Sequence, residues 1–141
     1  HYNDNAIDIV HFGPAHTDGD AVVFFRDANV IHTGDVFVRY GLPFIDGPNG
    51  GQLSGMIDVL WGVAGLISDN TTIIPGHGQL STRTDLLEYR SMLVTIRDRM
   101  LGQIAEGMSE DEVVAANPTQ GFAPPGAGTE RWVRAAYVDL R

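Results

Sequence analysis

Strand-like and helix-like segments alternate along this chain of 141 residues, and the alternation predicts an α/β fold built in layers. Two observations carry the prediction. Short runs of β-branched and aromatic residues end in turns rich in glycine, proline and aspartate. From residue 52 onward, apolar residues also recur at the three- and four-residue spacing of amphipathic helices. The length is that of one domain at most, and it suffices to bury a hydrophobic core.

Four segments are predicted to form strands: 6–12, 21–25, 30–33 and 71–74. The second and third are separated by a short turn at residues 27–29, so we expect them to pair as a hairpin. Segment 34–51 contains five glycines and two prolines and is expected to be a long loop. Loops of this length in a compact domain are usually functional or disordered.

A first helix is predicted over residues 52–68, where apolar residues line one face. Its core-facing residues are expected to be Leu53, Met56, Ile57, Leu60, Trp61, Ala64 and Ile67. A second long helix follows and is ended by Gly107. The apolar face of this second helix comprises Leu86, Tyr89, Leu93, Ile96, Met100 and Ile104.

The remainder of the chain is expected to be mostly helical. Ser109 and Glu112 match the capping-box pattern, which starts a short helix reaching about Ala116. An irregular stretch is expected over 117–128 and a last helix over 130–140.

We interpret residues 1–141 as a single partial domain, with 1–107 as its core and 108–141 as a helical C-terminal extension. The sequence begins at His1 and opens almost directly into a strand. A free sheet edge there would promote aggregation, so further strands are expected to precede it. The chain is therefore expected to be a fragment of a longer protein.

The composition argues against several classes of protein and site. The formal net charge of −9 argues against a basic surface for nucleic acid or anionic lipid. No apolar run approaches the ~20 residues of a membrane-spanning helix, so a soluble protein is expected. The chain has no cysteine, which excludes disulfides and thiolate ligands. Any metal ion must therefore be bound by histidine and carboxylate.

Three segments place a metal-ligand residue in a turn directly after a predicted strand. GPAHT carries His16, TGD carries Asp35 and PGHG carries His77. Glycine lets the backbone turn sharply, and strand ends at one edge of a sheet lie close together, so we expect the three to converge. Two imidazoles and a carboxylate suit Zn²⁺, Fe²⁺ or Mn²⁺. These three residues are expected to hold one ion weakly on their own.

The motifs GPAHTDGD, HTGDVF and IIPGHG resemble three successive motifs of the metallo-β-lactamase superfamily, and the likeness extends over about residues 6–105. The resemblance implies the C-terminal half of a four-layer αββα sandwich. It also implies that His16 binds one metal ion, that Asp35 bridges two ions and that His77 binds the second. The family's His-x-His-x-Asp-His motif does not occur in these residues. A missing N-terminal half, or a companion chain, is therefore expected to supply the other ligands and to cover an otherwise exposed apolar surface.

The function that the resemblance implies is that of a metal-dependent hydrolase in the full-length protein, most simply with two Zn²⁺ ions and with Fe or Mn as alternatives. A metal-activated hydroxide would attack a carbonyl carbon, and Asp35 would act as both bridging ligand and catalytic residue. Asp35 stands where the best-known zinc β-lactamases have cysteine. The chain thus resembles glyoxalase II-like thioesterases, lactonases and uncharacterised hydrolases more closely. The expected small-molecule substrates are esters, thioesters, lactones or β-lactams.

Residues near the three turns are candidates for supporting roles. Thr17 and Asp20 are placed to orient the ring of His16, although stabilisation of the local turn is an equal alternative. His32 precedes the turn that carries Asp35, where it either supports the site or is structural. His11 is expected to be a packing residue.

The long loop after Asp35 is a candidate wall of the substrate pocket. Arg39, Tyr40 and Phe44 lie in this loop, and Arg39 is a candidate for binding a substrate carboxylate. The alternative is a mobile surface loop without a role in binding.

Two other functions stay open from the sequence. One is an iron-dependent oxidoreductase on the same scaffold, which metal identity and oxygen consumption would separate from a hydrolase. The other is a non-catalytic half-domain that binds a partner. A homo-oligomer is possible, and the expected location is the bacterial cytoplasm or periplasm.

Overall fold

The computed structural model describes residues 6–141, and its strands form one four-stranded sheet. The strands, in the spatial order β1-β2-β3-β4, are β1 (Ile7–Val10), β2 (Val22–Phe25), β3 (Val30–His32) and β4 (Thr72–Ile74). β2 pairs antiparallel with both β1 and β3, whereas β3 and β4 are parallel. All four predicted strands are confirmed, each shorter than its apolar run, and β2 and β3 form the predicted hairpin.

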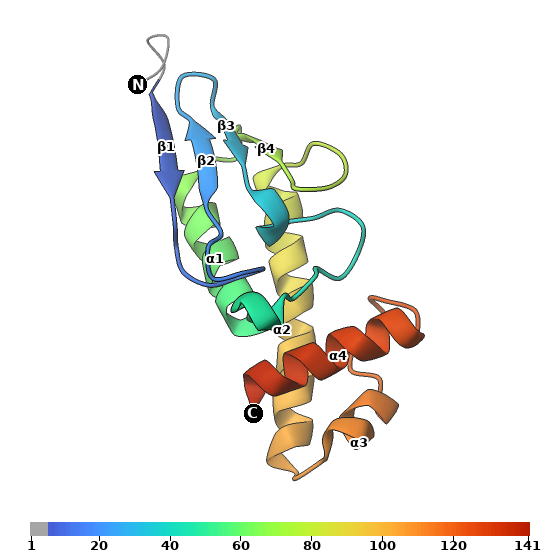
Figure 1. Ribbon diagram of the computed structural model, residues 1–141. Coiled ribbons are helices and arrows are strands. Elements are labelled where there is room, and N and C mark those ends of the chain that lie inside the picture. The colour runs from blue at the N-terminus through green and yellow to red at the C-terminus, as the bar shows by residue number, and fades with distance from the viewer. Residues whose placement is uncertain (1–5) are drawn as a thin grey trace.

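The described chain also contains four α-helices (Figure 1): α1 (Leu53–Leu66), which lies between β3 and β4 in the sequence, and α2 (Arg83–Ala105), α3 (Glu110–Ala115) and α4 (Ala127–Leu140), which follow β4. The predicted capping box of Ser109 and Glu112 starts α3. α4 begins at Ala127 rather than at residue 130, because the carbonyl of Gly126 already accepts the N–H of Glu130. The long loop contains two short 3-10 helices, η1 (Gly34–Val36) and η2 (Gly47–Asn49). Within residues 6–141, no helix combines the length and the apolar character that crossing a membrane requires.

The sheet is covered on one face only by the described residues. Phe24, Ile31 and Ile73 are neighbours across β2, β3 and β4, and they are buried in one hydrophobic cluster with side chains of α1 and α2. Figure 1 shows these two helices beside the sheet. The alternate residues point to the other face, where Ile9 is 73% exposed and Phe25 is also exposed. These two apolar side chains are not covered by the described residues. One sheet with helices on one face corresponds to half of a sandwich in which two such sheets pack face to face.

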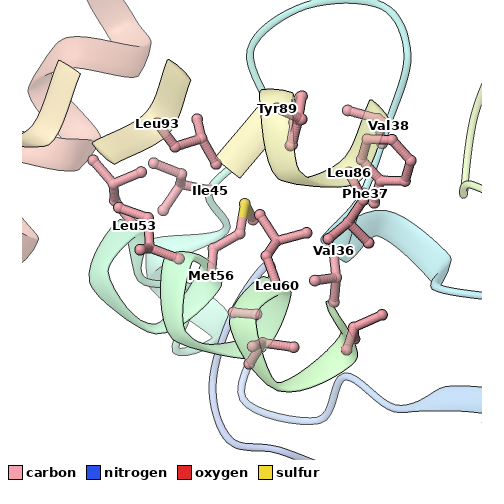
Figure 2. Close-up of a cluster of buried hydrophobic side chains, with 14 of the residues drawn as sticks. Val36, Phe37, Val38, Ile45, Leu53, Met56, Leu60, Leu86, Tyr89 and Leu93 are labelled. Atoms are coloured by element: carbon pink, nitrogen blue, oxygen red, sulfur yellow. The ribbon is translucent and has the colours of Figure 1, made fainter. Parts of the chain in front are cut away.

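The core lies directly beneath the turn that carries Asp35. Val36, Phe37 and Val38 follow this residue, and all three are buried among side chains of α1 and α2 (Figure 2). The ring of Phe37 meets that of Tyr89 edge-on, with 5.1 Å between centroids. Because core side chains are close-packed, these contacts hold the backbone of the turn in place.

Trp61 is not a core residue, contrary to the prediction. It is 59% exposed, and the guanidinium of Arg90 lies 4.9 Å from the centre of its ring. The buried stripe of α1 is centred on Leu60, and Trp61 shares the solvent-facing stripe with Asp58 and Gly65. Trp61 lies four residues after the buried Ile57, but at this position of the helix the side chain is already outside the buried apolar face.

The C-terminal extension packs onto the same core. Trp132 and Ala136 of α4 are buried and belong to the hydrophobic cluster that contains the side chains of α1 and α2. Asp139 accepts hydrogen bonds from the backbone N–H and the hydroxyl of Ser54, at 2.9 and 3.0 Å. This carboxylate thus caps the first turn of α1 and ties α4 to it.

Candidate metal centre

The sheet topology explains why three distant turns meet. β1 and β3 are both antiparallel to β2, and β4 is parallel to β3, so β1, β3 and β4 run in one direction. Their C-terminal ends therefore lie at the same edge of the sheet. His16, Asp35 and His77 follow these three ends, as the sequence predicted.

Asp35 lies between the two histidines, with one imidazole facing each carboxylate oxygen. Nε2 of His16 is 3.6 Å from Oδ2, and Nε2 of His77 is 3.3 Å from Oδ1. The side chains of His16, Asp35 and His77 are 17%, 38% and 61% exposed, respectively. The cluster therefore opens to solvent on the His77 side.

The ring orientation of His16 is set by a main-chain group. Its Nδ1 lies 2.9 Å from the carbonyl oxygen of Phe44. A carbonyl oxygen only accepts, so Nδ1 carries a proton, and Nε2 is the ring nitrogen that faces Asp35. A metal ion at Asp35 would therefore be bound through Nε2. This role of Phe44 could not be predicted from the sequence, because the contact is made by its backbone and leaves no signal in residue type.

The turn that carries His77 is joined to the loop after Asp35. The N–H of Gly76 lies within hydrogen-bond distance of the carbonyls of Gly34 and Phe37, at 2.9 and 3.0 Å. The carbonyl of His77 accepts the N–H of Arg39 at 2.9 Å. These bonds hold the two turns against each other, and with them Asp35 and His77.

Tyr40 borders the cluster on the His77 side. Its ring centroid lies 5.6 Å from that of His77. Partial burial, and after it the negative charge of Asp35, raises the pKa of Tyr40. The phenol is therefore protonated at neutral pH.

The donor set fits two metal ions that share a carboxylate better than one ion. Two ligand atoms on a tetrahedral Zn²⁺ are about 3.3 Å apart, given metal–ligand distances of ~2.0–2.1 Å. The two nitrogen–oxygen distances around Asp35, 3.3 and 3.6 Å, are close to this value. Across residues 6–141, however, no three histidine or acidic side chains are grouped closely enough to hold one ion. The expectation that His16, Asp35 and His77 alone hold a single ion is wrong, because the histidines face different oxygens of Asp35.

The supporting residues act on backbone turns rather than on the imidazole rings. The carboxylate of Asp20 accepts the N–H and the hydroxyl of Thr17, at 2.9 and 3.0 Å, so this pair stabilises the turn after His16. Nδ1 of His32 accepts the N–H of Gly34 at 3.0 Å, which steadies the turn that carries Asp35. His11 is structural, since its Nδ1 donates to the carbonyl of Asp20.

The guanidinium of Arg39, a candidate for binding a substrate carboxylate, is paired with a residue of α2. Its guanidinium lies 3.3 Å from Oδ1 of Asp85, in the first turn of α2. Asp85 also accepts the backbone N–H and the hydroxyl of Thr82, at 2.8 and 2.7 Å, and completes a capping box. Asp85 thus joins the loop of the candidate site to the start of α2.

Replacing Asp85 by Asn is expected to lower the free energy of unfolding by about 0.5–1 kcal/mol at neutral pH, because a charged cap at the start of α2 is lost. The hydrogen bonds from Thr82, with a smaller contribution from Arg39, lower the pKa of Asp85. A lowered pKa in the folded state stabilises the protein above the unfolded pKa, and this stabilisation is lost as the pH falls through the folded value. Urea denaturation of both proteins between pH 7 and pH 2 measures the difference.

The two proteins should become equally stable at low pH, where Asp85 itself is protonated. Glu88→Gln, an exposed acid-to-amide change on the same helix, is the control and should change stability little. A deficit of the Asp85→Asn protein that persists unchanged at the lowest pH would contradict the assigned role of the carboxylate.

Comparison with known proteins identifies the fold. No protein-family model and no curated protein matches the sequence. Among solved structures, the chain is similar to the sec-alkylsulfatase Pisa1 from a Pseudomonas species, with 17% identity over 94% of this chain and a TM-score of 0.72. It is also similar to a metallo-β-lactamase from Pontibacter korlensis, at 14% identity over 64% of this chain and a TM-score of 0.55. The DIM-1 metallo-β-lactamase matches at 18% identity over 63% of the chain, with a TM-score of 0.54.

These likenesses show that the chain has part of the metallo-β-lactamase fold, as the motifs predicted. The matched region covers 24% of the sulfatase, 42% of the Pontibacter protein and 41% of DIM-1. The chain thus spans less than half the length of each of these proteins. At such low identities the comparison establishes the fold and leaves the reaction to be argued from the site.

Proposed function

We propose that this chain is the C-terminal part of a dinuclear metal hydrolase, most simply a zinc enzyme, in which His16, Asp35 and His77 are metal ligands. The observation that carries the proposal is the position of Asp35, with a histidine nitrogen facing each of its carboxylate oxygens. A carboxylate that presents one oxygen to each of two imidazoles is suited to bridge two ions. The β-lactamases and the sulfatase that share the fold make hydrolysis the favoured class of reaction.

The residues of the chain have distinct tasks in this function. His16 presents Nε2 because Phe44 holds its other ring nitrogen, and His77 approaches Asp35 from the solvent-exposed side. The negative charge of Asp35 would neutralise part of the positive charge of the two divalent metal ions. When bound, the metal ions supply Lewis acidity and lower the pKa of water. The ring contact of Tyr40 with His77 supports a role for its protonated phenol as a hydrogen-bond donor to a substrate oxygen.

The remaining ligands are proposed to come from a second sheet. A zinc site with catalytic function has at least three protein ligands, so one histidine and one shared carboxylate per ion are too few. The open face of the sheet carries Ile9, Val23 and Phe25 in adjacent strands, an apolar surface of the kind that a facing sheet covers in a sandwich. The second sheet belongs either to the same polypeptide or to a companion chain.

The proposed substrates are small molecules with a hydrolysable carbonyl group: esters, thioesters, lactones or β-lactams. Asp35 favours esters, thioesters and lactones over β-lactams as substrates. The best-known zinc β-lactamases have a cysteine at this position of the motif, and a bridging carboxylate is a harder ligand than cysteine.

Metal analysis of the intact protein tests this function. We expect bound zinc, or iron or manganese in its place, and a loss of hydrolysis when a chelator removes it. His77→Ala is expected to lower kcat/KM by at least about a hundredfold, because the loss of a metal ligand should exceed the 10–100-fold effect of losing a group that only supports one. His11→Ala, which removes an exposed imidazole outside the cluster, is the matched control and should leave metal content and kcat/KM unchanged.

Two results would reject the hydrolase. A folded intact protein without any bound transition metal would exclude the metal centre. Bound iron, together with oxygen consumption and no hydrolysis, would instead establish an oxidoreductase. Equal effects of His77→Ala and His11→Ala on metal content would show that the assignment of ligands is wrong.

A further inference from the structure

A cavity of about 700 Å³ separates the loop after Asp35 from the C-terminal extension. Residues 40–45 form one wall, and residues of segment 122–135 form the other. The lining side chains are mostly apolar and include Leu42, Phe122 and Trp132. The volume lies within the range of small-molecule sites in proteins, which is about 300–1,000 Å³.

Two residues of the cavity wall also border the candidate metal centre. Phe44 lines the cavity, and its ring centroid lies 5.6 Å from that of His16 while its carbonyl binds the same imidazole. Tyr40 also lines the cavity, and its ring centroid lies 5.6 Å from that of His77. The cavity therefore lies beside the cluster around Asp35.

The lining of the cavity contains a single charged residue. Arg131 is exposed and forms no ion pair with any residue of 6–141, whereas Arg134, one turn further along α4, pairs with Glu110 and Asp111. The chain as a whole is acidic, with a net charge of −9. A guanidinium without an ion-pair partner among the described residues, on the wall of an apolar cavity, is available to an anion.

We infer that this cavity binds the aliphatic part of the substrate, and that Arg131 receives a negatively charged group of the same molecule. The inference rests on the proposed function and specifies its substrate class: carboxylic esters or thioesters with a medium-length aliphatic chain and an anionic group. The extension thus contributes the specificity of the enzyme, since α4 supplies Arg131, Trp132 and Ala135 to the wall.

Binding of octanoate to the intact, metal-loaded protein tests the cavity without requiring hydrolysis. Ala135→Trp fills the cavity from α4 and is expected to weaken octanoate binding at least about tenfold, since each buried methylene contributes about fourfold in affinity. Val138→Trp adds the same side chain at an exposed position of the same helix, outside the cavity, and should leave binding unchanged. Isothermal titration calorimetry measures both.

A second variant removes the positive charge of Arg131, which is exposed and therefore not part of the packed core. Arg131→Gln is expected to weaken octanoate binding about two- to fivefold, as for an exposed ion pair, and to leave octanol binding unchanged. If Ala135→Trp does not fold, this variant still decides the case: equal octanoate binding by wild type and Arg131→Gln overturns the role of the guanidinium.

Measurements of ester hydrolysis distinguish the role of the cavity from the hydrolase function. The ratio of kcat/KM for p-nitrophenyl octanoate to that for the acetate should fall in Ala135→Trp and stay constant in Val138→Trp. Loss of octanoate binding in Ala135→Trp, in a protein that hydrolyses no ester, would support the cavity and reject the hydrolase. Unchanged octanoate binding in Ala135→Trp would reject the cavity whether or not esters are hydrolysed.

Discussion

Replacing Asp35 by Asn is expected to lower kcat/KM of the intact protein by at least about a hundredfold and to reduce the metal content below two ions per chain. The change keeps the size of the side chain. It removes the negative charge, and it puts an NH₂ group in place of one of the two oxygens that now face His16 and His77. An amide cannot present an oxygen to both sides, so one of the two proposed ions loses a ligand. Elemental analysis and steady-state kinetics measure the two effects.

The control for Asp35→Asn is Asp18→Asn, the same chemical change at an exposed position in the loop after His16. It should leave kcat/KM and metal content within about twofold of wild type, as surface substitutions usually do. Both variants should also unfold at the same temperature as wild type in the absence of metal. If Asp35→Asn retains two ions per chain and full activity, Asp35 is not the bridging ligand.

Substituting Gly76 by Ala is expected to destabilise the protein by about 1–3 kcal/mol and to weaken metal binding, although the substitution adds only one methyl group. The new Cβ would lie 2.3 Å from Oδ1 of Asp35 and 2.6 Å from the carbonyl oxygen of Gly34. Neither neighbour yields easily: the N–H of Gly76 is held by Gly34 and Phe37, and the chain after Asp35 enters the core. The clash is therefore expected to displace the carboxylate from His77.

Gly102→Ala in α2 is the matched control for Gly76→Ala. A Cβ at Gly102 would meet nothing within 4 Å, and alanine is favoured over glycine inside a helix. This variant should gain up to about 1 kcal/mol in the free energy of unfolding, with unchanged metal content. Urea denaturation and metal titration distinguish the two glycines. Similar behaviour of both variants would show that close packing around Gly76 does not position Asp35.

The secondary structure was predictable because its signals are local. The strands are short apolar runs, and the hairpin turn, the cap at Ser109 and the stop at Gly107 depend on residues next to each other in the sequence. The errors arose where burial depends on what packs from elsewhere. Trp61 has the spacing of a core residue, but it is 59% exposed, with the guanidinium of Arg90 over its ring. Periodicity states which face a side chain occupies and not how wide the buried stripe is.

For the candidate site, the sequence by itself determined the residue types and their setting. His16, Asp35 and His77 each follow a strand in a turn that contains glycine or leads to it, and strand direction then brings the three to one edge of the sheet. Only the tertiary structure decided the geometry. In the folded protein, one histidine faces each carboxylate oxygen of Asp35, and Nδ1 of His16 donates to a backbone carbonyl. Arg39 forms an ion pair with Asp85.

The tertiary structure alone also revealed the cavity beside the site, because its walls come from segments about eighty residues apart that share no sequence pattern. Contacts of this kind depend on the distances that folding creates between remote side chains and main-chain groups. The metal-binding chemistry of His16, Asp35 and His77 depends on residue type, whereas the cavity forms only where α4 packs against the rest of the fold.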